Sequence, residues 1–187
     1  MNRRRHLPAQ RGFSLIELIL VVAIIALSAS LLFPVSASIM DRANTQKCLE
    51  NLRQIGIAVH LAAVDNDNRY PRIEIDPQNP IYAPEEGAKP LHEALLPYGI
   101  TDKVLQCPAD LNGPNWYSRV KTSYMWQPYS EDEPTANITI YTRRGGFPGR
   151  PSRVRLATDY EAVHTPDAPG GRKKMNVVYA DGHVVSR

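Results

Sequence analysis

The residue types that most often bind metals or catalyse reactions gather near the C-terminus of this 187-residue chain. Asp159, His164, Asp181 and His183 lie close together in sequence, and carboxylates and imidazoles are common ligands of divalent metals. Their spacing matches no familiar metal motif, and no nucleophile motif accompanies them. We therefore predict that the chain is not an enzyme, and that exposed histidines here are dispensable for folding. A metal-binding or catalytic C-terminal region is the alternative.

Two acidic clusters, Asp65–Asp67 and Glu131–Glu133, are a second candidate for cation binding. Calcium takes oxygen ligands, but neither cluster has the regular spacing of a defined calcium loop. A solvated charged turn is the simpler interpretation. We therefore predict no cofactor, with calcium as the alternative.

Cys48 and Cys107 are the only cysteines in the chain. In an oxidising compartment they could form a disulfide, and in the chain-entropy model such a loop of nearly sixty residues contributes about 4 kcal/mol. Two buried free thiols are the alternative.

Glu17 is the one charged residue in the apolar stretch from Phe13 to Val35. As a helix this stretch is about 34 Å long, enough to cross a bilayer. A core helix that is apolar on all sides would need a larger protein around it. A secretory signal peptide is the other alternative, with small residues at 27–29 or 35–37, but its apolar region is usually shorter.

The charge before this stretch favours a retained membrane anchor. Arg3, Arg4, Arg5 and Arg11 precede it, and no acidic residue does. This pattern places the N-terminus in the cytoplasm and the remainder outside. Because these are four of the 22 basic side chains, 18 remain against 19 acidic ones, so the rest of the chain is close to neutral. The charge therefore gives no support for nucleic-acid binding.

The sequence Gly12-Phe13-Ser14-Leu15-Ile16-Glu17 resembles the prepilin processing site of type IV pilins and type II secretion pseudopilins. The resemblance implies that a membrane prepilin peptidase cleaves after Gly12 and methylates the new amino terminus at Phe13. Counted from Phe13, Glu17 is the fifth mature residue, where the family has a glutamate. Pro34 is the twenty-second, where many pilins have a proline that bends the helix.

This family assignment gives Glu17 a role in assembly. A carboxylate in hydrocarbon needs a partner, and cleavage creates a positive amine at Phe13. In the family, the glutamate is thought to meet the amino terminus of a neighbouring subunit, a pairing that sets register. The implied partners are the prepilin peptidase, other pilin-like subunits and the bacterial inner membrane. The protein would cross that membrane once, with its head in the periplasm or in an extracellular fibre.

The apolar pattern changes from continuous to striped beyond Pro34, which should bend or loosen the helix. A single inward face then follows helical spacing, and it consists of Cys48, Leu52, Ile55, Val59 and Ala62. The spacing predicts one helix from Phe13 to about Val64, stopped by the turn-forming residues 65–68.

The remainder of the chain has the pattern of short strands and loops. A short helix is predicted at Leu91–Leu96. Strands are predicted at Val104–Cys107, Ser123–Pro128, Ile138–Arg143, Val154–Thr158, Val177–Ala180 and His183–Ser186. Asp181-Gly182 separates the last two and predicts a hairpin turn with positive φ at both residues.

The phrase NVVYADGHV also resembles the C-terminal segment of many prepilin-like proteins, which carries a histidine, a spacer and Asp-Gly. Here sixteen residues separate His164 from Asp181, whereas the family pattern has nine. We interpret Asp181 and Gly182 as a structural turn that closes the sheet.

Together these features predict an α+β protein with a long N-terminal helix packed on a small antiparallel-sheet head. The helix is apolar in its first half and amphipathic in its second. The predicted parts are a cleaved leader (1–12), the helix (13–65) and the head (66–187). The predicted function is a structural subunit of a type IV pilus or a type II secretion pseudopilus. The alternative is a membrane-tethered envelope protein with a ligand- or metal-binding head that is not assembled into a fibre.

Overall fold

A computed structural model describes residues 14–74, 87–111, 113–127, 135, 139–142, 145–164 and 171–187. For residues 31–38, 139–142 and 145–148 the description covers the backbone only. Gly12, Phe13 and the acidic cluster Glu131–Glu133 lie outside the described residues.

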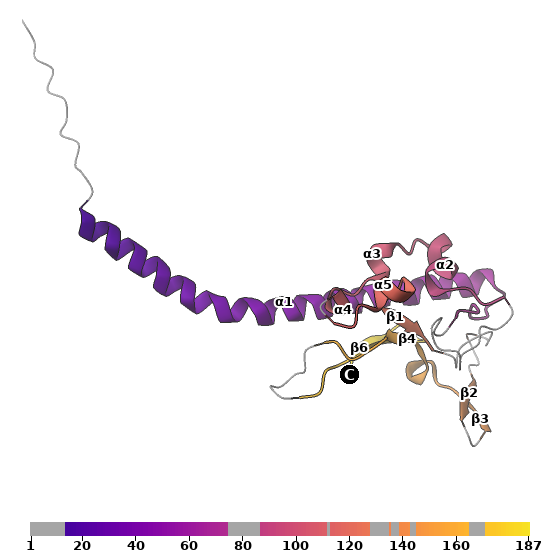
Figure 1. The fold of residues 1–187 in the computed structure, drawn as a ribbon. Helices are drawn as coiled ribbons and strands as arrows, with labels where there is room; N and C mark the ends of the chain where they lie inside the picture. The colour runs from indigo at the N-terminus through magenta and orange to yellow at the C-terminus, as the bar shows by residue number, and fades with distance from the viewer. Residues whose placement is uncertain are drawn as a thin grey trace, which may run out of the picture. The chain divides into compact units, whose positions relative to one another are not determined.

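The dominant element is α1, a 51-residue helix that spans Leu15–Asp65 (Figure 1). Its backbone remains helical through Pro34. It ends in a turn in which Asp67 and Asn68 both have positive φ, at 53° and 57°. Aspartate and asparagine tolerate this left-handed conformation better than most residues. The turn-forming residues that were predicted to end the helix therefore do so by adopting it.

Two compact units divide the chain, Met1–Met40 and Asp41–Arg187. The second half of α1 therefore belongs to the same unit as the sheet, because its inward face forms part of the core. All five residues of the predicted stripe are buried, with Ala62 the most exposed at 4%. The predicted α+β class, with an amphipathic half-helix packed on an antiparallel head, is confirmed.

Four strands form the main sheet, in the order β1-β4-β5-β6, and every neighbouring pair is antiparallel. Their bounds are Tyr124–Trp126, Arg155–Asp159, Asn176–Tyr179 and Val184–Ser186. A separate two-stranded sheet consists of β2, Thr139–Thr142, and β3, Gly145–Pro148. The sequence pattern did not predict β3.

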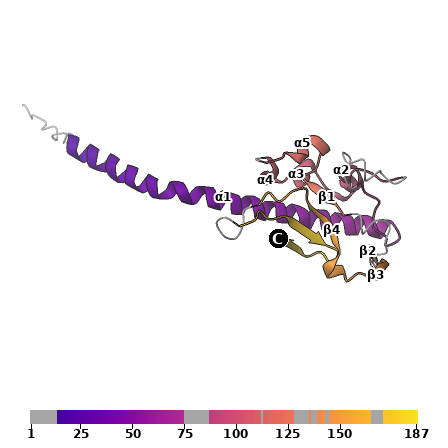
Figure 2. The same cartoon turned by 60° about the horizontal axis from the view of Figure 1, so that its bottom comes forward.

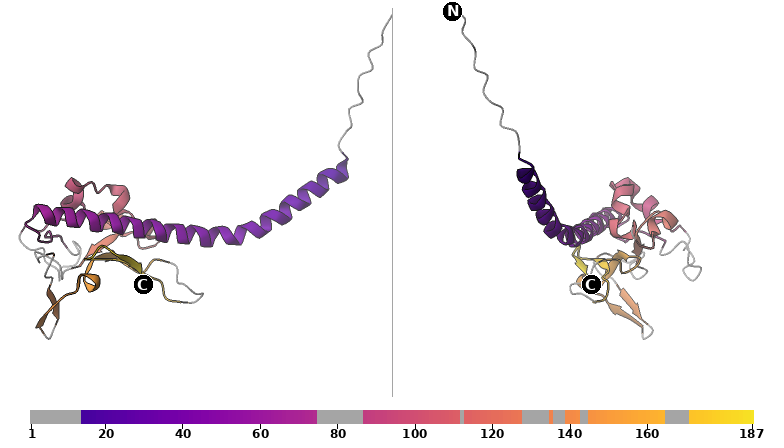
Figure 3. Two further views of the ribbon diagram at one scale, coloured as in Figure 1. Left: turned by 180° about the vertical axis from the view of Figure 1, so that it is seen from behind. Right: turned by 60° about the vertical axis from the view of Figure 1, so that its left-hand side comes forward.

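Several short helices complete the head: α2 (Leu91–Leu95), α3 (Asp102–Leu105), α4 (Pro108–Leu111), α5 (Trp116–Val120), and the 3-10 turns Leu96–Tyr98 and Pro151–Arg153. Figure 2 and Figure 3 show α2, α3 and α5 on one side of the second half of α1 and β4 to β6 on the other. The predicted strand Val104–Cys107 is wrong. Val104 and Leu105 are buried from the helical turn α3, and a short apolar run does not distinguish a strand from a buried helix.

Close contact between α1 and the sheet depends on Gly56. A Cβ atom at this position would lie 2.8 Å from Cγ2 of Val178 in β5. Only a residue without a side chain allows β5 to approach the helix this closely.

The β5–β6 hairpin forms where Asp181-Gly182 predicted it, but with a different turn. Gly182 donates its N–H to the carbonyl of Tyr179 at 2.8 Å, and Tyr179 donates to the carbonyl of His183 at 3.0 Å. Only Gly182 of the two has positive φ, at 85°. The connection is therefore one residue longer than the two-residue turn, with a left-handed glycine after the first turn.

Candidate functional site

The first candidate site is the start of α1, where Glu17 folds back on the helix terminus. The backbone N–H of Ser14 donates to Glu17 Oε2 at 2.9 Å. Ser14 precedes the first helical residue, and Glu17 is the third, so this is one arm of a capping box. The carboxylate also lies at the positive end of the helix dipole. The Ser-x-x-Glu spacing was present in the sequence, and our sequence analysis missed it.

The helix surface after Glu17 is apolar and uncovered. Every residue from Ser14 to Ser30 is exposed, and the large apolar side chains range from 75% exposed at Leu15 to 47% at Val21. Within this described segment, no face of the helix is buried in a core of its own chain. Such a surface marks a contact with lipid or with other proteins. Among the residues that the structure describes, no helix is both long enough and apolar enough to cross a membrane.

The second candidate site is a buried polar cluster in the head. His164 Nε2 lies 2.9 Å from Asp159 Oδ2 and 2.7 Å from Asn176 Nδ2. Asp159 ends β4 and Asn176 begins β5, and a backbone bridge between His164 and Lys174 brings the histidine to them. Exposed histidines were expected here, but His164 is 1% exposed. The sequence did not reveal this because the bridge joins His164 to Lys174, ten residues further on, outside any strand predicted from the sequence.

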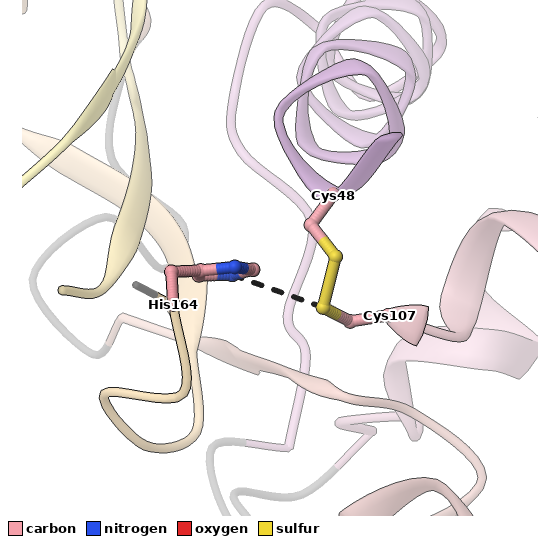
Figure 4. A group of neighbouring side chains, drawn as sticks. All are labelled: Cys48, Cys107 and His164. Atoms are coloured by element: carbon pink, nitrogen blue, oxygen red, sulfur yellow. Dashed lines mark hydrogen bonds between the residues drawn. A yellow bond between two sulfur atoms is a disulfide. The ribbon is translucent and has the colours of Figure 1, made fainter. Parts of the chain in front are cut away.

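A disulfide joins Cys48 of α1 to Cys107, which follows α3, and both residues are buried. Figure 4 shows the imidazole of His164 directed at this disulfide, and His164 Nε2 lies 3.8 Å from Cys107 Sγ. The bridge is the pairing considered from the sequence. Its proximity to His164 was not predicted.

The cluster does not have the geometry of a nucleophilic site. In a nucleophile–base–orienter arrangement, one imidazole nitrogen faces the nucleophile and the other faces the orienting group. Here Asp159, Asn176 and Cys107 all approach the same nitrogen, Nε2 of His164. Within the described part of the chain, three buried atoms of the cluster lack a hydrogen-bond partner: His164 Nδ1, Asp159 Oδ1 and Asn176 Oδ1.

Burial also sets the electrostatics of the cluster. Desolvation raises the pKa of the Asp159 carboxyl above its ordinary value, and the hydrogen bond with His164 opposes this shift. The folded protein therefore holds the Asp159 proton to higher pH than the unfolded chain does.

The four residues first considered as metal ligands separate into two pairs. Asp159 pairs with His164 in the core, whereas His183 Nδ1 contacts Asp181 Oδ1 in the hairpin, and its ring stacks on Tyr179 at 4.3 Å between centroids. Across the described residues, the group close enough to hold one ion is instead Cys48, Cys107 and His164. Asp65 and Asp67 are exposed and belong to no such group.

Two further buried polar residues position this region. Asn51 of α1 donates through Nδ2 to the carbonyl of Gln106 at 3.0 Å and to the Tyr124 hydroxyl at 3.1 Å. Asp110 accepts hydrogen bonds from the backbone N–H groups of Trp116 and Tyr117, both at 3.0 Å. The sequence analysis did not identify them, because isolated Asn and Asp residues are usually exposed.

A long helix that is apolar and uncovered at its start, followed by a small antiparallel head, is a pilin-like architecture. Residues 7–33 match a protein family described as the prokaryotic N-terminal methylation motif. The N-terminal part of the chain therefore carries a prepilin-type methylation motif.

Two curated relatives carry the name type II secretion system core protein G. The protein from Pectobacterium carotovorum subsp. carotovorum is 35% identical over 65 residues, which cover 35% of this chain and 41% of the relative. The protein from Klebsiella michiganensis is 35% identical over 66 residues, which cover 35% of this chain and 46% of the relative. The match thus spans less than half the length of these relatives. No solved structure matches the chain.

Proposed function

We propose that this protein is a structural subunit of a type IV pilus or a type II secretion pseudopilus. A prepilin peptidase would cleave between Gly12 and Phe13 and methylate Phe13, and the mature subunit would assemble with other pilin-like subunits. The uncovered apolar half of α1 is the observation that carries this proposal. The family match at residues 7–33 and the name of the two relatives support it.

The exposed apolar side chains account for the need to assemble. Burying a large aliphatic side chain is worth about 1.5–3 kcal/mol, and ten such side chains lie exposed between Leu15 and Leu27. In the proposed sequence of events, inner-membrane lipid covers them first and helices of neighbouring subunits replace the lipid. The arginines before Gly12 support an orientation with the N-terminus in the cytoplasm and the head outside.

Glu17 would serve both its own helix and a neighbouring subunit. One carboxylate accepts several hydrogen bonds, so the bond from Ser14 is compatible with a second bond from the amino terminus of another Phe13. In an apolar environment this pairing would favour one axial register over others.

The processing step is tested by N-terminal sequencing and mass measurement of the protein isolated from the membrane fraction. We expect a chain that begins at Phe13 and carries one additional methyl group. Gly12→Leu should leave the leader attached, and Gly12→Ala is the milder control. A mature terminus at Ser30 or Ser38 would favour a secretory signal peptide and contradict the proposal.

The assembly step is tested with two variants that separate charge from helix capping. Glu17→Gln keeps a side chain that can cap at the third helical position but has no charge, and Glu17→Val has neither property. We expect both to be inserted and cleaved but depleted from fibre fractions, as measured by immunoblot. Wild-type incorporation of Glu17→Gln would reject charge pairing and leave capping as the role of Glu17.

A further inference from the structure

Three potential metal ligands converge in the centre of the head, where α1 meets the loop after α3 (Figure 4). One donor atom each from Cys48, Cys107 and His164 lies within 4.8 Å of the other two. The three residues are at most 1% exposed. Thiolate sulfur and imidazole nitrogen are the ligands that zinc prefers in proteins.

We propose that Cys48, Cys107 and His164 bind one divalent ion of the zinc type when the disulfide is reduced. The ion would then connect the same two segments that the disulfide connects. The head would thus have two interchangeable cross-links at one position, a disulfide under oxidising conditions and a metal under reducing ones. This proposal does not depend on assembly into a fibre.

The positions of the donors fit this geometry. Zn–S bonds of about 2.3 Å and Zn–N bonds of about 2.0–2.1 Å at tetrahedral angles place sulfur about 3.6 Å from nitrogen and the two sulfurs about 3.8 Å apart. Cys107 Sγ already lies 3.8 Å from His164 Nε2. After reduction, the two cysteine side chains have to rotate apart to reach this separation.

The charge of the site also suits an ion. Two thiolates balance the two positive charges of the ion and a neutral imidazole adds none, so the buried region gains no net charge. Asp159 and Asn176 lie 2.9 and 2.7 Å from His164 Nε2, so this nitrogen has to exchange these contacts for the ion when the ion binds.

The chemical steps balance with a simple reductant. A water-soluble phosphine and one water molecule convert the disulfide to two thiols and the phosphine to its oxide. Binding of the ion then displaces the two thiol protons. A phosphine is preferable to a dithiol in the experiment because it does not supply competing sulfur ligands.

The test uses the full chain in mild detergent, freed of metal, reduced under nitrogen and titrated with Co²⁺ alone. We expect one equivalent to bind with visible absorption of tetrahedral cobalt and a thiolate-to-cobalt charge-transfer band, and Zn²⁺ to abolish both. The unreduced protein should show neither. His164→Ala should weaken binding at least about tenfold, a loss typical of disrupted metal sites, whereas His183→Ala should bind as the wild type does.

Two outcomes would overturn the proposal. One is a reduced wild type that shows no cobalt absorption, whether or not tryptophan fluorescence shows its head to be folded. The other is a His164→Ala protein that binds Co²⁺ as tightly as the wild type, because binding would then come from the two thiols without the assembled site.

Discussion

Replacing His164 by alanine removes the centre of the buried cluster, and it should destabilise the head strongly. The imidazole contacts Asp159 Oδ2 and Asn176 Nδ2 and lies against the Cys48–Cys107 disulfide. Alanine would leave the amide nitrogen of Asn176 without this partner, and the buried carboxyl group of Asp159 would lose its contact with the imidazole.

The expected loss follows from the burial of these groups. Each buried polar group left without a partner costs about 1–3 kcal/mol, and breaking a buried ionisable pair costs about 3–5 kcal/mol. We therefore expect a loss of about 3 kcal/mol. For a chain of this size this corresponds to a decrease in Tm of roughly 6–12 °C.

Thermal unfolding of the oxidised full chain in detergent, followed by tryptophan fluorescence, measures this loss because Trp126 is buried in the head. His183→Ala is the matched control. Its side chain is 39% exposed and bonds to Asp181 within the hairpin, so its Tm should change by little more than 1 °C. If the two variants had the same Tm, the buried cluster would not contribute to stability as argued.

Three further predictions concern the same unit. Because burial raises the pKa of Asp159 above 3.8, the stabilisation from its protonated form is complete below that pH and is lost as pH rises through the folded pKa. The free energy of unfolding from urea titrations should therefore fall with pH relative to Asp159→Asn, by at most about 1.4 kcal/mol per pH unit. Parallel curves for the two proteins would contradict this. Gly56→Ala should cost about 1–3 kcal/mol through its contact with Val178, and Val178→Ala should reduce that additional cost in a double-mutant cycle. Gly182→Val should cost about 1–2 kcal/mol because φ is 85°, and Gly182→Asn should cost less in the same unfolding assay; equal losses would rule out backbone strain as the cause.

The sequence predicted the elements that depend on local pattern. The periodicity of α1, its inward stripe and the approximate positions of four sheet strands follow from spacings of three, four and two residues. The hairpin at Asp181 was also predictable, but its turn length was not, because one glycine with positive φ is compatible with two connections.

The features that long-range contacts determine were not predicted. The sequence does not distinguish His164 from the other four histidines. The bridge to Lys174 places it beside Asp159 and Asn176. Val104 and Leu105 of α3 form a short apolar run that is compatible with either a strand or a buried helix, and the sequence does not distinguish the two. The capping box of Glu17 differs, since its Ser-x-x-Glu spacing is local and can be recognised in the sequence.

Cys48 lies where α1 begins to contact the core of the head. In the described part of α1, Cys48 is the first buried residue, and residues 39–43 before it are exposed. The disulfide therefore fastens the helix to the head at the point where its contact with the core begins. A helix packed on a sheet opens most readily from its end, so a cross-link at the first buried position opposes that opening most directly. The disulfide at this position lies next to His164, whose Nε2 is 3.8 Å from Cys107 Sγ and which we propose as the third metal ligand.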